Sequence, residues 1–247
     1  MGREAAAQGA DARGSGGVTP RPTTVLFDIG STLVFPNWAL ISEELARDDV
    51  HLAPDLLAAR EPHARRTLDN EAFVARTSDR SRWDEYFGLI VRECGVPEFP
   101  PGALERLRVY NDAHNLWEHV PPDVPGVLVA LRRRGCRLGA VSNSNGSVQR
   151  KLTELGLARE FEVVLDSAVE GIEKPDPRLF LRALARMRVR PEHALYVGDI
   201  YHVDVVGARA AGIRPILLDP CGLHADKSCP RIATLEELLD VVGESDR

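Results

Sequence analysis

Short apolar runs recur along the chain, each bounded by polar or turn-forming residues. The run at 24–27 is apolar and β-branched and ends at Asp28, which is typical of a buried parallel strand. Runs of similar form predict four further strands, at 137–142, 161–165, 194–197 and 214–218. Apolar residues between and after these runs recur at helical spacing and predict helices at 126–134, 147–155, 177–187, 203–211 and 235–242. Alternation of strands and helices with short connections predicts an α/β fold with a doubly wound, Rossmann-like parallel sheet.

The long segment after the first strand has a different pattern, because apolar residues recur there at helical spacing without a convincing strand. Two such sets are Leu40, Ile41 and Leu45, and Trp83, Tyr86, Phe87, Ile90 and Val91. A further helix is predicted over 103–117, with the inward residues Leu104, Leu107, Val109 and Leu116. We therefore expect an all-helical cap, residues 36–120, inserted in an α/β core formed by residues 23–35 and 121–247.

Composition and charge limit the classes of protein to which the chain can belong. It has 247 residues, of which 44% are hydrophobic and 28% charged, as expected of a globular protein with a sizeable core. The net charge of −6 provides no basic field for nucleic acid, so we expect no nucleic-acid partner. No apolar run reaches the roughly 18 residues needed to cross a membrane, so we expect no membrane span.

The N-terminal segment and the cysteines indicate a cytoplasmic protein. Residues 1–22 are rich in Ala, Gly and Arg and lack an apolar core, so we expect a disordered tail and no secretory signal. The four cysteines are widely spaced, as is typical of reduced thiols: Cys94, Cys136, Cys221 and Cys229. Cys221 and Cys229 flank His224, but the spacing matches no common zinc finger and no fourth ligand is evident, so we expect no zinc site.

Polar side chains stand where the predicted strands end. Asp28, Ser142 and Asp199 each end or directly follow a strand, and parallel strands place such ends along one edge of a sheet. Lys174, one of only three lysines, follows the third predicted strand, and Asp204 lies five residues after Asp199. Carboxylates gathered this closely repel each other and need a cation, and oxygen ligands with room for water and phosphate favour Mg²⁺. The ammonium and hydroxyl groups would then bind the remaining phosphate oxygens.

Four segments, in this order along the chain, resemble the four motifs of the haloacid dehalogenase (HAD) superfamily. They are 28–33 (DIGSTL), 141–143 (VSN), 174–177 (KPDP) and 198–204 (GDIYHVD). The resemblance extends over residues 23–243 and points to the branch with a helical cap inserted just after the first motif. It implies a Mg²⁺-dependent hydrolase of a small phosphorylated metabolite that acts through an aspartyl-phosphate.

The resemblance also implies a role for individual residues. Asp28 would be the nucleophile, and the Ser142 hydroxyl and the Asn143 backbone would hold phosphate oxygens. Lys174 would neutralise charge between Asp28 and the phosphoryl group. The implied ligands of Mg²⁺, direct or through water, are Asp28, Gly30 through its backbone carbonyl, Asp199 and Asp204.

Gly30 departs from the family pattern. Most family phosphatases have a second Asp at this position, which protonates the leaving oxygen and later activates water. Such an acid–base group typically contributes about 10²–10⁴-fold to the rate, so we expect a slow enzyme or one biased to leaving groups of low pKa, such as aryl or acyl phosphates. Residues considered as replacements, without a ranking, are Asn37, Glu43, His114 and His119, whereas His51 and His63 are expected at the surface.

Two alternatives to a phosphatase stay open. A metal-independent hydrolase similar to the 2-haloacid dehalogenases also lacks the second Asp, although the retained Asp199 and Asp204 argue against it. A binding or regulatory protein of this superfamily with weakened catalysis is the other. Phosphonoacetaldehyde hydrolase chemistry needs a cap lysine, and residues 36–120 contain none. Cap arginines that could meet an anionic substrate, most of them expected on solvated helix faces, are Arg47, Arg60, Arg76, Arg80 and Arg82.

Overall fold

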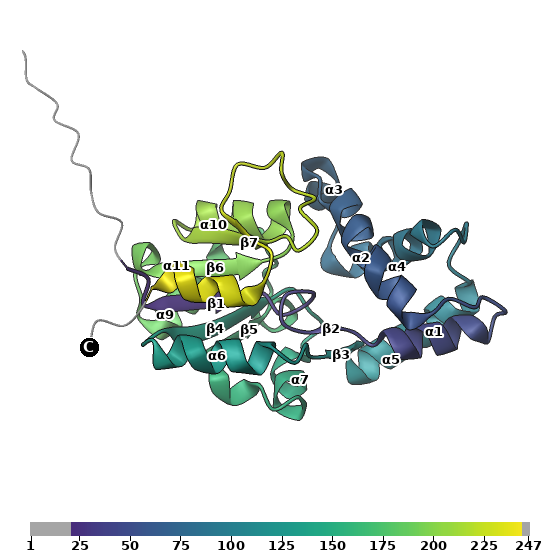
Figure 1. The fold of residues 1–247 in the computed structure, drawn as a ribbon, viewed down its shortest axis with the longest axis horizontal. Coiled ribbons are helices and arrows are strands. Elements are labelled where there is room, and N and C mark those ends of the chain that lie inside the picture. Colours follow the sequence, from purple (N-terminus) through teal and green to yellow (C-terminus); the bar gives the residue numbers. More distant parts are fainter. Residues whose placement is uncertain (1–20, 244–247) are drawn as a thin grey trace, which may run out of the picture.

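The core of the molecule is a parallel β-sheet of six strands. The computed structural model describes residues 21–243, and Figure 1 shows this sheet at one end of the molecule and a lobe of helices at the other. The strand order is β5–β4–β1–β6–β7–β8, and every neighbouring pair is parallel. The strands are β1 Thr24–Phe27, β4 Arg137–Ser142, β5 Val163–Asp166, β6 Ala194–Gly198, β7 Arg214–Leu218 and β8 Arg231–Ile232. The predicted doubly wound parallel sheet is therefore confirmed.

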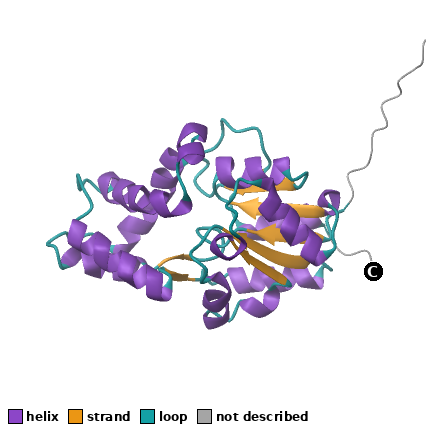
Figure 2. Ribbon diagram, turned by 180° about the vertical axis from the view of Figure 1, so that it is seen from behind, coloured by secondary structure: helices purple, strands orange, loops and turns teal. Residues whose placement is uncertain are grey.

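Helices cover both faces of the sheet, because successive side chains of a strand point to opposite faces. Val25 and Phe27 of β1 belong to one apolar cluster, and Leu26 belongs to a second. The first cluster includes α6 (Val124–Arg133), α7 (Val148–Glu154) and α11 (Leu238–Val242), and the second α9 (Pro177–Met187) and α10 (Val206–Ala210). Figure 2 shows the orange strands flanked by helices. Short helical segments complete the core: η1 Ala158–Glu160, α8 Ser167–Glu170, η2 Pro191–His193, η3 Tyr201–Val205 and η4 Leu235–Glu237.

The helical lobe has an apolar core of its own. It consists of α1 (Trp38–Ala46), α2 (Pro54–Leu68), α3 (Glu71–Arg76), α4 (Asp79–Glu93) and α5 (Pro101–His114). Residues spaced by one or two helical turns meet inside it, among them Ile41, Leu45, Leu57, Phe87, Ile90 and Leu107. Val109 was predicted to face inward, but 63% of its surface is exposed, because Leu107 of the same helix occupies the inner face.

A two-stranded antiparallel sheet joins the lobe to the core. It pairs β2 (Phe35–Pro36) with β3 (Trp117–His119). The expectation of a helix reaching Trp117 was therefore wrong at its end, since α5 stops at His114 and the chain becomes extended. Segments of two or three residues are too short to show the alternation that identifies a strand, and for the same reason β8 was missed.

Element boundaries in the core differ from the predicted ones by a few residues. The helix expected at 203–211 begins at Tyr201 as a π-helical turn and continues as α10. Residues 1–20 of the expected N-terminal tail lie outside the described residues, but Arg21 packs on the core, where its Nε donates to the Val242 carbonyl at 3.1 Å. In the described part of the chain, no helix combines the length and apolar character needed to span a membrane.

Candidate active site

The carboxyl ends of β1, β4 and β6 form the edge of the sheet that carries the polar side chains. β1 pairs with β4 on one side and with β6 on the other, so Asp28, Ser142 and Asp199 come together there as predicted. The backbone N–H of Asp28 donates to the Val197 carbonyl at 2.8 Å, which fixes Asp28 as an extension of the sheet.

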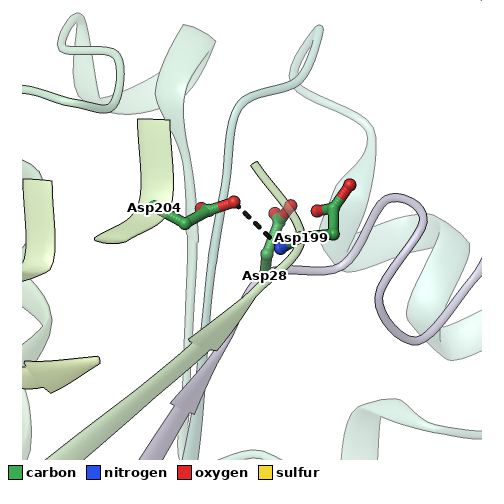
Figure 3. A group of neighbouring side chains, drawn as sticks. All are labelled: Asp28, Asp199 and Asp204. Carbon is green, nitrogen blue, oxygen red and sulfur yellow. Dashed lines mark hydrogen bonds between the residues drawn. The ribbon is translucent and has the colours of Figure 1, made fainter. Parts of the chain in front are cut away.

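Three buried carboxylates meet at this edge. One oxygen each from Asp28, Asp199 and Asp204 lies within 4.8 Å of the other two, and Figure 3 shows the three side chains side by side. The backbone N–H groups of Asp199 and Ile200 donate to Asp204 Oδ2 at 3.2 and 3.0 Å. A Cβ atom at Gly198 would lie 2.3 Å from Asp204 Cγ, so the close approach of Asp204 to the strand end requires glycine there.

Lys174 bridges two of the carboxylates. Its Nζ lies 2.8 Å from Asp28 Oδ1, 2.8 Å from Asp204 Oδ1 and 2.9 Å from the Tyr196 hydroxyl. The side-chain amide of Asn143 holds the backbone of Lys174. Its Oδ1 accepts from the Lys174 N–H at 2.8 Å, and its Nδ2 donates to the Lys174 carbonyl at 3.0 Å. Burial opposes the charge of the ammonium, but Asp204 and Asp28 outweigh it and raise the pKa of Lys174.

The crowding of charge is visible in the pKa of Asp28. Burial raises this pKa, Lys174 lowers it, and Asp204 and Asp199 raise it further, so that it lies well above its usual value. A bound divalent cation would reverse this balance. Carboxylate oxygens are the hard donors that Mg²⁺ prefers, so the donor set of Asp28, Asp199 and Asp204 fits that ion.

A cavity of about 180 Å³ opens onto Asp28 and Asp199. Residues of the core line one side of it, namely Asp28, Gly30, Ser142, Asn143, Lys174 and Asp199. Residues in or bordering the lobe line the other, among them Arg65, Arg82, Trp83, Tyr86 and Trp117. Among the described residues, the Ser142 hydroxyl makes only a long contact, 3.4 Å, with the neighbouring Asn143 carbonyl, so it is free to bind a ligand oxygen. The volume lies below the roughly 300–1,000 Å³ of pockets for drug-sized ligands, which indicates a small ligand.

Comparisons with known proteins agree with this arrangement. Residues 22–212 match the family model described as haloacid dehalogenase-like hydrolase. The chain belongs to this family. It is 32% identical over 235 residues to the glyceraldehyde 3-phosphate phosphatase of Methanopyrus kandleri, a match that covers 89% of this chain and 97% of that protein.

A further relative supports the same family, and a solved structure supports the fold. Haloacid dehalogenase-like hydrolase domain-containing protein 3 of Mus musculus is 34% identical over 174 residues, 68% of this chain and 69% of the mouse protein. The crystal structure of the putative HAD hydrolase YfnB of Bacillus subtilis aligns with a TM-score of 0.65 at 20% identity, over 90% of this chain and 99% of that one. This second likeness concerns the fold alone.

In this HAD hydrolase an arginine from the lobe reaches the carboxylates. Arg65 Nη1 lies 2.6 Å from Asp199 Oδ2, and the Thr32 hydroxyl donates to the other oxygen of Asp199 at 3.1 Å. Glu61, one helical turn before Arg65, lies 3.5 Å from its Nε and accepts from the Tyr86 hydroxyl at 2.9 Å. Burial raises the pKa of Glu61, whereas the charge of Arg65 lowers it. Burial outweighs the charge, so the pKa of Glu61 lies above its usual value.

Sequence reasoning missed Arg65 and Glu61. Both lie on the helix face that also carries the buried Leu57, Ala64 and Leu68 of α2. Charged residues within an apolar stripe are a signal for a buried charged site, and that signal was available in the sequence.

The proposed replacements for the missing Asp do not line the cavity. In the described part of the chain, Asn37 caps α1 and donates to Glu118, while Glu43, His114 and His119 are exposed. Of the cap arginines considered, Arg82 lines the cavity, Arg47, Arg60 and Arg76 are exposed, and the side chain of Arg80 lies outside the described part of the structure.

A second contact between lobe and core is centred on Asp69, at the C-terminal end of α2. Its carboxylate accepts from the backbone N–H groups of Tyr201 and His202, both at 2.8 Å. His202 Nδ1 lies 2.7 Å and His224 Nε2 3.1 Å from the same carboxylate. Burial alone would raise the pKa of Asp69, but the hydrogen bonds from His224 and His202 outweigh it and lower the pKa to about 2. His224 is thus engaged with Asp69 and, through Nδ1 at 3.2 Å, with Asp219.

Proposed function

We propose that this HAD hydrolase is a Mg²⁺-dependent phosphatase of a small phosphorylated metabolite. The observation that carries the proposal is the position of Lys174, which holds Asp28 at 2.8 Å within a buried group of three carboxylates. A fully buried ammonium beside a carboxylate holds that carboxylate in one orientation. The ammonium also balances the negative charge of an anionic group that approaches the carboxylate.

Asp28 acts as the nucleophile. One of its oxygens bonds to phosphorus while the ester P–O bond breaks and its electron pair leaves with the leaving oxygen. Water then attacks the phosphorus of the aspartyl-phosphate, which releases inorganic phosphate and restores the Asp28 carboxylate. Ser142 donates its hydroxyl to a phosphate oxygen, and Lys174 stabilises the charge between Asp28 and the phosphoryl group.

Asp28, Asp199 and Asp204, with the backbone carbonyl of Gly30, would hold Mg²⁺ directly or through water. When bound, the ion would offset the negative charge of the carboxylates and of the phosphate group. The helical lobe, residues 36–120, acts as a cap over the cavity. It excludes water and selects the substrate.

Arg82 recognises a second anionic group of the substrate. It is buried at the cavity, and its hydrogen bonds go to the Thr77 carbonyl at 3.1 Å and the Thr77 hydroxyl at 3.3 Å. No carboxylate of the described residues pairs with it. A buried guanidinium without a counter-charge is unfavourable, and a substrate carboxylate or second phosphate would supply that charge.

The test is release of inorganic phosphate from a panel of small phosphate esters, with Mg²⁺ and with EDTA. Phosphate release that depends on Mg²⁺ is the expected result. Halide release from 2-haloacids without metal would instead identify a dehalogenase-like hydrolase. Binding of Mg²⁺ and phosphate without turnover, even of aryl phosphates, would identify a binding or regulatory protein.

The Asp28→Asn variant tests the assignment of the nucleophile. It removes the attacking oxygen and keeps the shape of the side chain, so we expect turnover to be abolished while the circular dichroism spectrum is unchanged. Retained phosphate release in this variant would contradict the role of Asp28.

A further inference from the structure

The space beside Gly30, two residues after Asp28, is occupied by the indole of Trp117. A Cβ atom at Gly30 would lie 3.3 Å from Trp117 Nε1 and 3.6 Å from its Cδ1. Asp28, Gly30 and Trp117 all line the same cavity. The N–H edge of the indole therefore stands where a side chain at position 30 would begin.

This indole N–H has no partner within the protein. Trp117 Nε1 is buried and makes no hydrogen bond in the described part of the chain. An indole nitrogen can only donate, so the acceptor that satisfies it has to come from a ligand or water in the cavity. Buried donors without a partner are rare, and one that faces a cavity can be satisfied by a ligand that binds there.

Neighbouring aromatic rings hold the indole in place. Trp117 stacks on Tyr86, with ring centroids 6.2 Å apart and planes inclined by 27°, and meets Phe87 edge to face at 6.2 Å. The N–H direction is thus set before a ligand binds. A donor oriented in advance contributes more to a transition state than one that has to be ordered during the reaction.

We propose that Trp117 Nε1–H donates a hydrogen bond to the leaving oxygen of the phosphate ester. The proposal rests on the phosphatase function proposed above. When the P–O bond breaks, its electron pair remains on the leaving oxygen, and the indole stabilises that charge while keeping its own proton. A basic alkoxide then takes its proton from water, whereas an aryloxide of low pKa departs without one.

Trp117 in this role acts as a catalytic residue that is a hydrogen-bond donor but not an acid. Its contribution grows with the negative charge on the leaving oxygen, so it depends on the leaving group. A tryptophan that only packs against the cavity wall would affect all substrates alike. The dependence of kcat/KM on the pKa of the leaving group therefore separates the two roles.

The experiment compares wild type with Trp117→Phe over a series from nitrophenyl phosphate to alkyl phosphates. We expect kcat/KM to fall about tenfold for alkyl phosphates and less than about twofold for nitrophenyl phosphate, as one lost hydrogen bond allows. The plot of log kcat/KM against leaving-group pKa becomes steeper. An equal change for every leaving group overturns the proposal.

Trp83→Phe is the matched control. Trp83 lies on α4 and lines the same cavity, and its buried Nε1 also has no partner among the described residues. It is not among the atoms nearest to a Cβ at Gly30. We expect this variant to change kcat/KM by one common factor for all leaving groups. A steeper plot in Trp83→Phe equal to that of Trp117→Phe would overturn the assignment to Trp117.

Gly30→Ala keeps the proposal testable if Trp117→Phe does not fold. The added methyl group presses on Trp117 Nε1 and displaces it, so the same selective loss for alkyl phosphates is expected. An unchanged slope in Gly30→Ala would overturn the proposal. Wild-type protein that releases phosphate from no ester would overturn the proposed function as well, whereas wild-type activity with an unchanged slope in the variants overturns this inference alone.

Discussion

At the scale of single residues, Asp204 explains how the acidic cluster is built. Its Oδ1 accepts from Lys174 and Tyr196, and its Oδ2 accepts from the backbone N–H groups of Asp199 and Ile200. Both oxygens are thus engaged in positioning Lys174 and the turn after β6. Asp28 makes fewer such bonds, which is consistent with the role of nucleophile proposed for it.

Arg82→Gln tests whether the substrate has a second anionic group. The variant removes the buried positive charge, so we expect KM for O-phosphoserine to rise about tenfold or more, the value of a lost charge-assisted hydrogen bond. KM for phosphoethanolamine, which lacks the carboxylate, should change little. The measurement is steady-state kinetics on both esters.

The exposed Arg60 of α2 provides the control, and Arg60→Gln should leave both KM values unchanged. Equal effects of Arg82→Gln on the two esters would show that Arg82 supports the cavity and does not recognise a carboxylate.

At the scale of elements, the turn between β6 and η3 depends on the absence of a side chain at Gly198. Gly198→Ala would place a methyl group 2.3 Å from Asp204 Cγ. We expect the free energy of unfolding to fall by about 1–3 kcal/mol, the usual cost of overpacking. Urea denaturation measures this difference.

Gly126 of α6 is the matched control for that substitution. A Cβ atom at Gly126 meets nothing within 4 Å, and the residue lies in a helix, so Gly126→Ala should stabilise the protein by roughly 0.5–1 kcal/mol. A Gly198→Ala protein as stable as wild type would show that Asp204 can move aside without loss.

The strands and their chemical ends could be predicted from sequence because they follow local rules. A short apolar run predicts a strand. Parallel pairing then brings residues at the strand ends, such as Asp28 and Asp199, to one edge of the sheet wherever they lie in the chain. Spacing shows that Arg65 and Leu57 share a helix face, but it does not show what that face meets. The position of Trp117 beside Gly30 depends on how β3 returns to the core, which no local pattern contains.

At the scale of the whole molecule, two of the contacts between the lobe and the core lie beside the group of carboxylates or next to it along η3. Arg65 reaches Asp199 at the strand edge, and Asp69 joins the first turn of η3 and the loop that carries His224. Arg65 lies on α2 and Asp69 is the residue that caps its C-terminal end, so α2 couples the lobe to the site at both contacts.

The Asp69 contact makes stability depend on pH in acid. Because its pKa is lowered to about 2, the contribution of Asp69 is complete above roughly pH 4 and is lost as the pH falls through about 2. We expect Asp69→Asn to lower the free energy of unfolding at pH 5, and the difference from wild type to shrink as the pH is lowered to 3. Urea denaturation at each pH provides the measurement.

Asp55→Asn, at an exposed position in the first turn of α2, is the control and should change stability little at any of these pH values. A difference between wild type and Asp69→Asn that stays constant from pH 5 to 3 would contradict the assigned contribution of the carboxylate.

The pairing of β2 with β3 has a consequence for how such molecules can diversify. Phe35 and His119 are neighbours across this ribbon, so the chain leaves the core and re-enters it at almost the same point. Replacing the intervening segment with a longer, shorter or unrelated module would leave the ends of the sheet where they are. Recombination can therefore replace the helical lobe while the group of carboxylates at the sheet edge is preserved. The same replacement can be made by protein engineering.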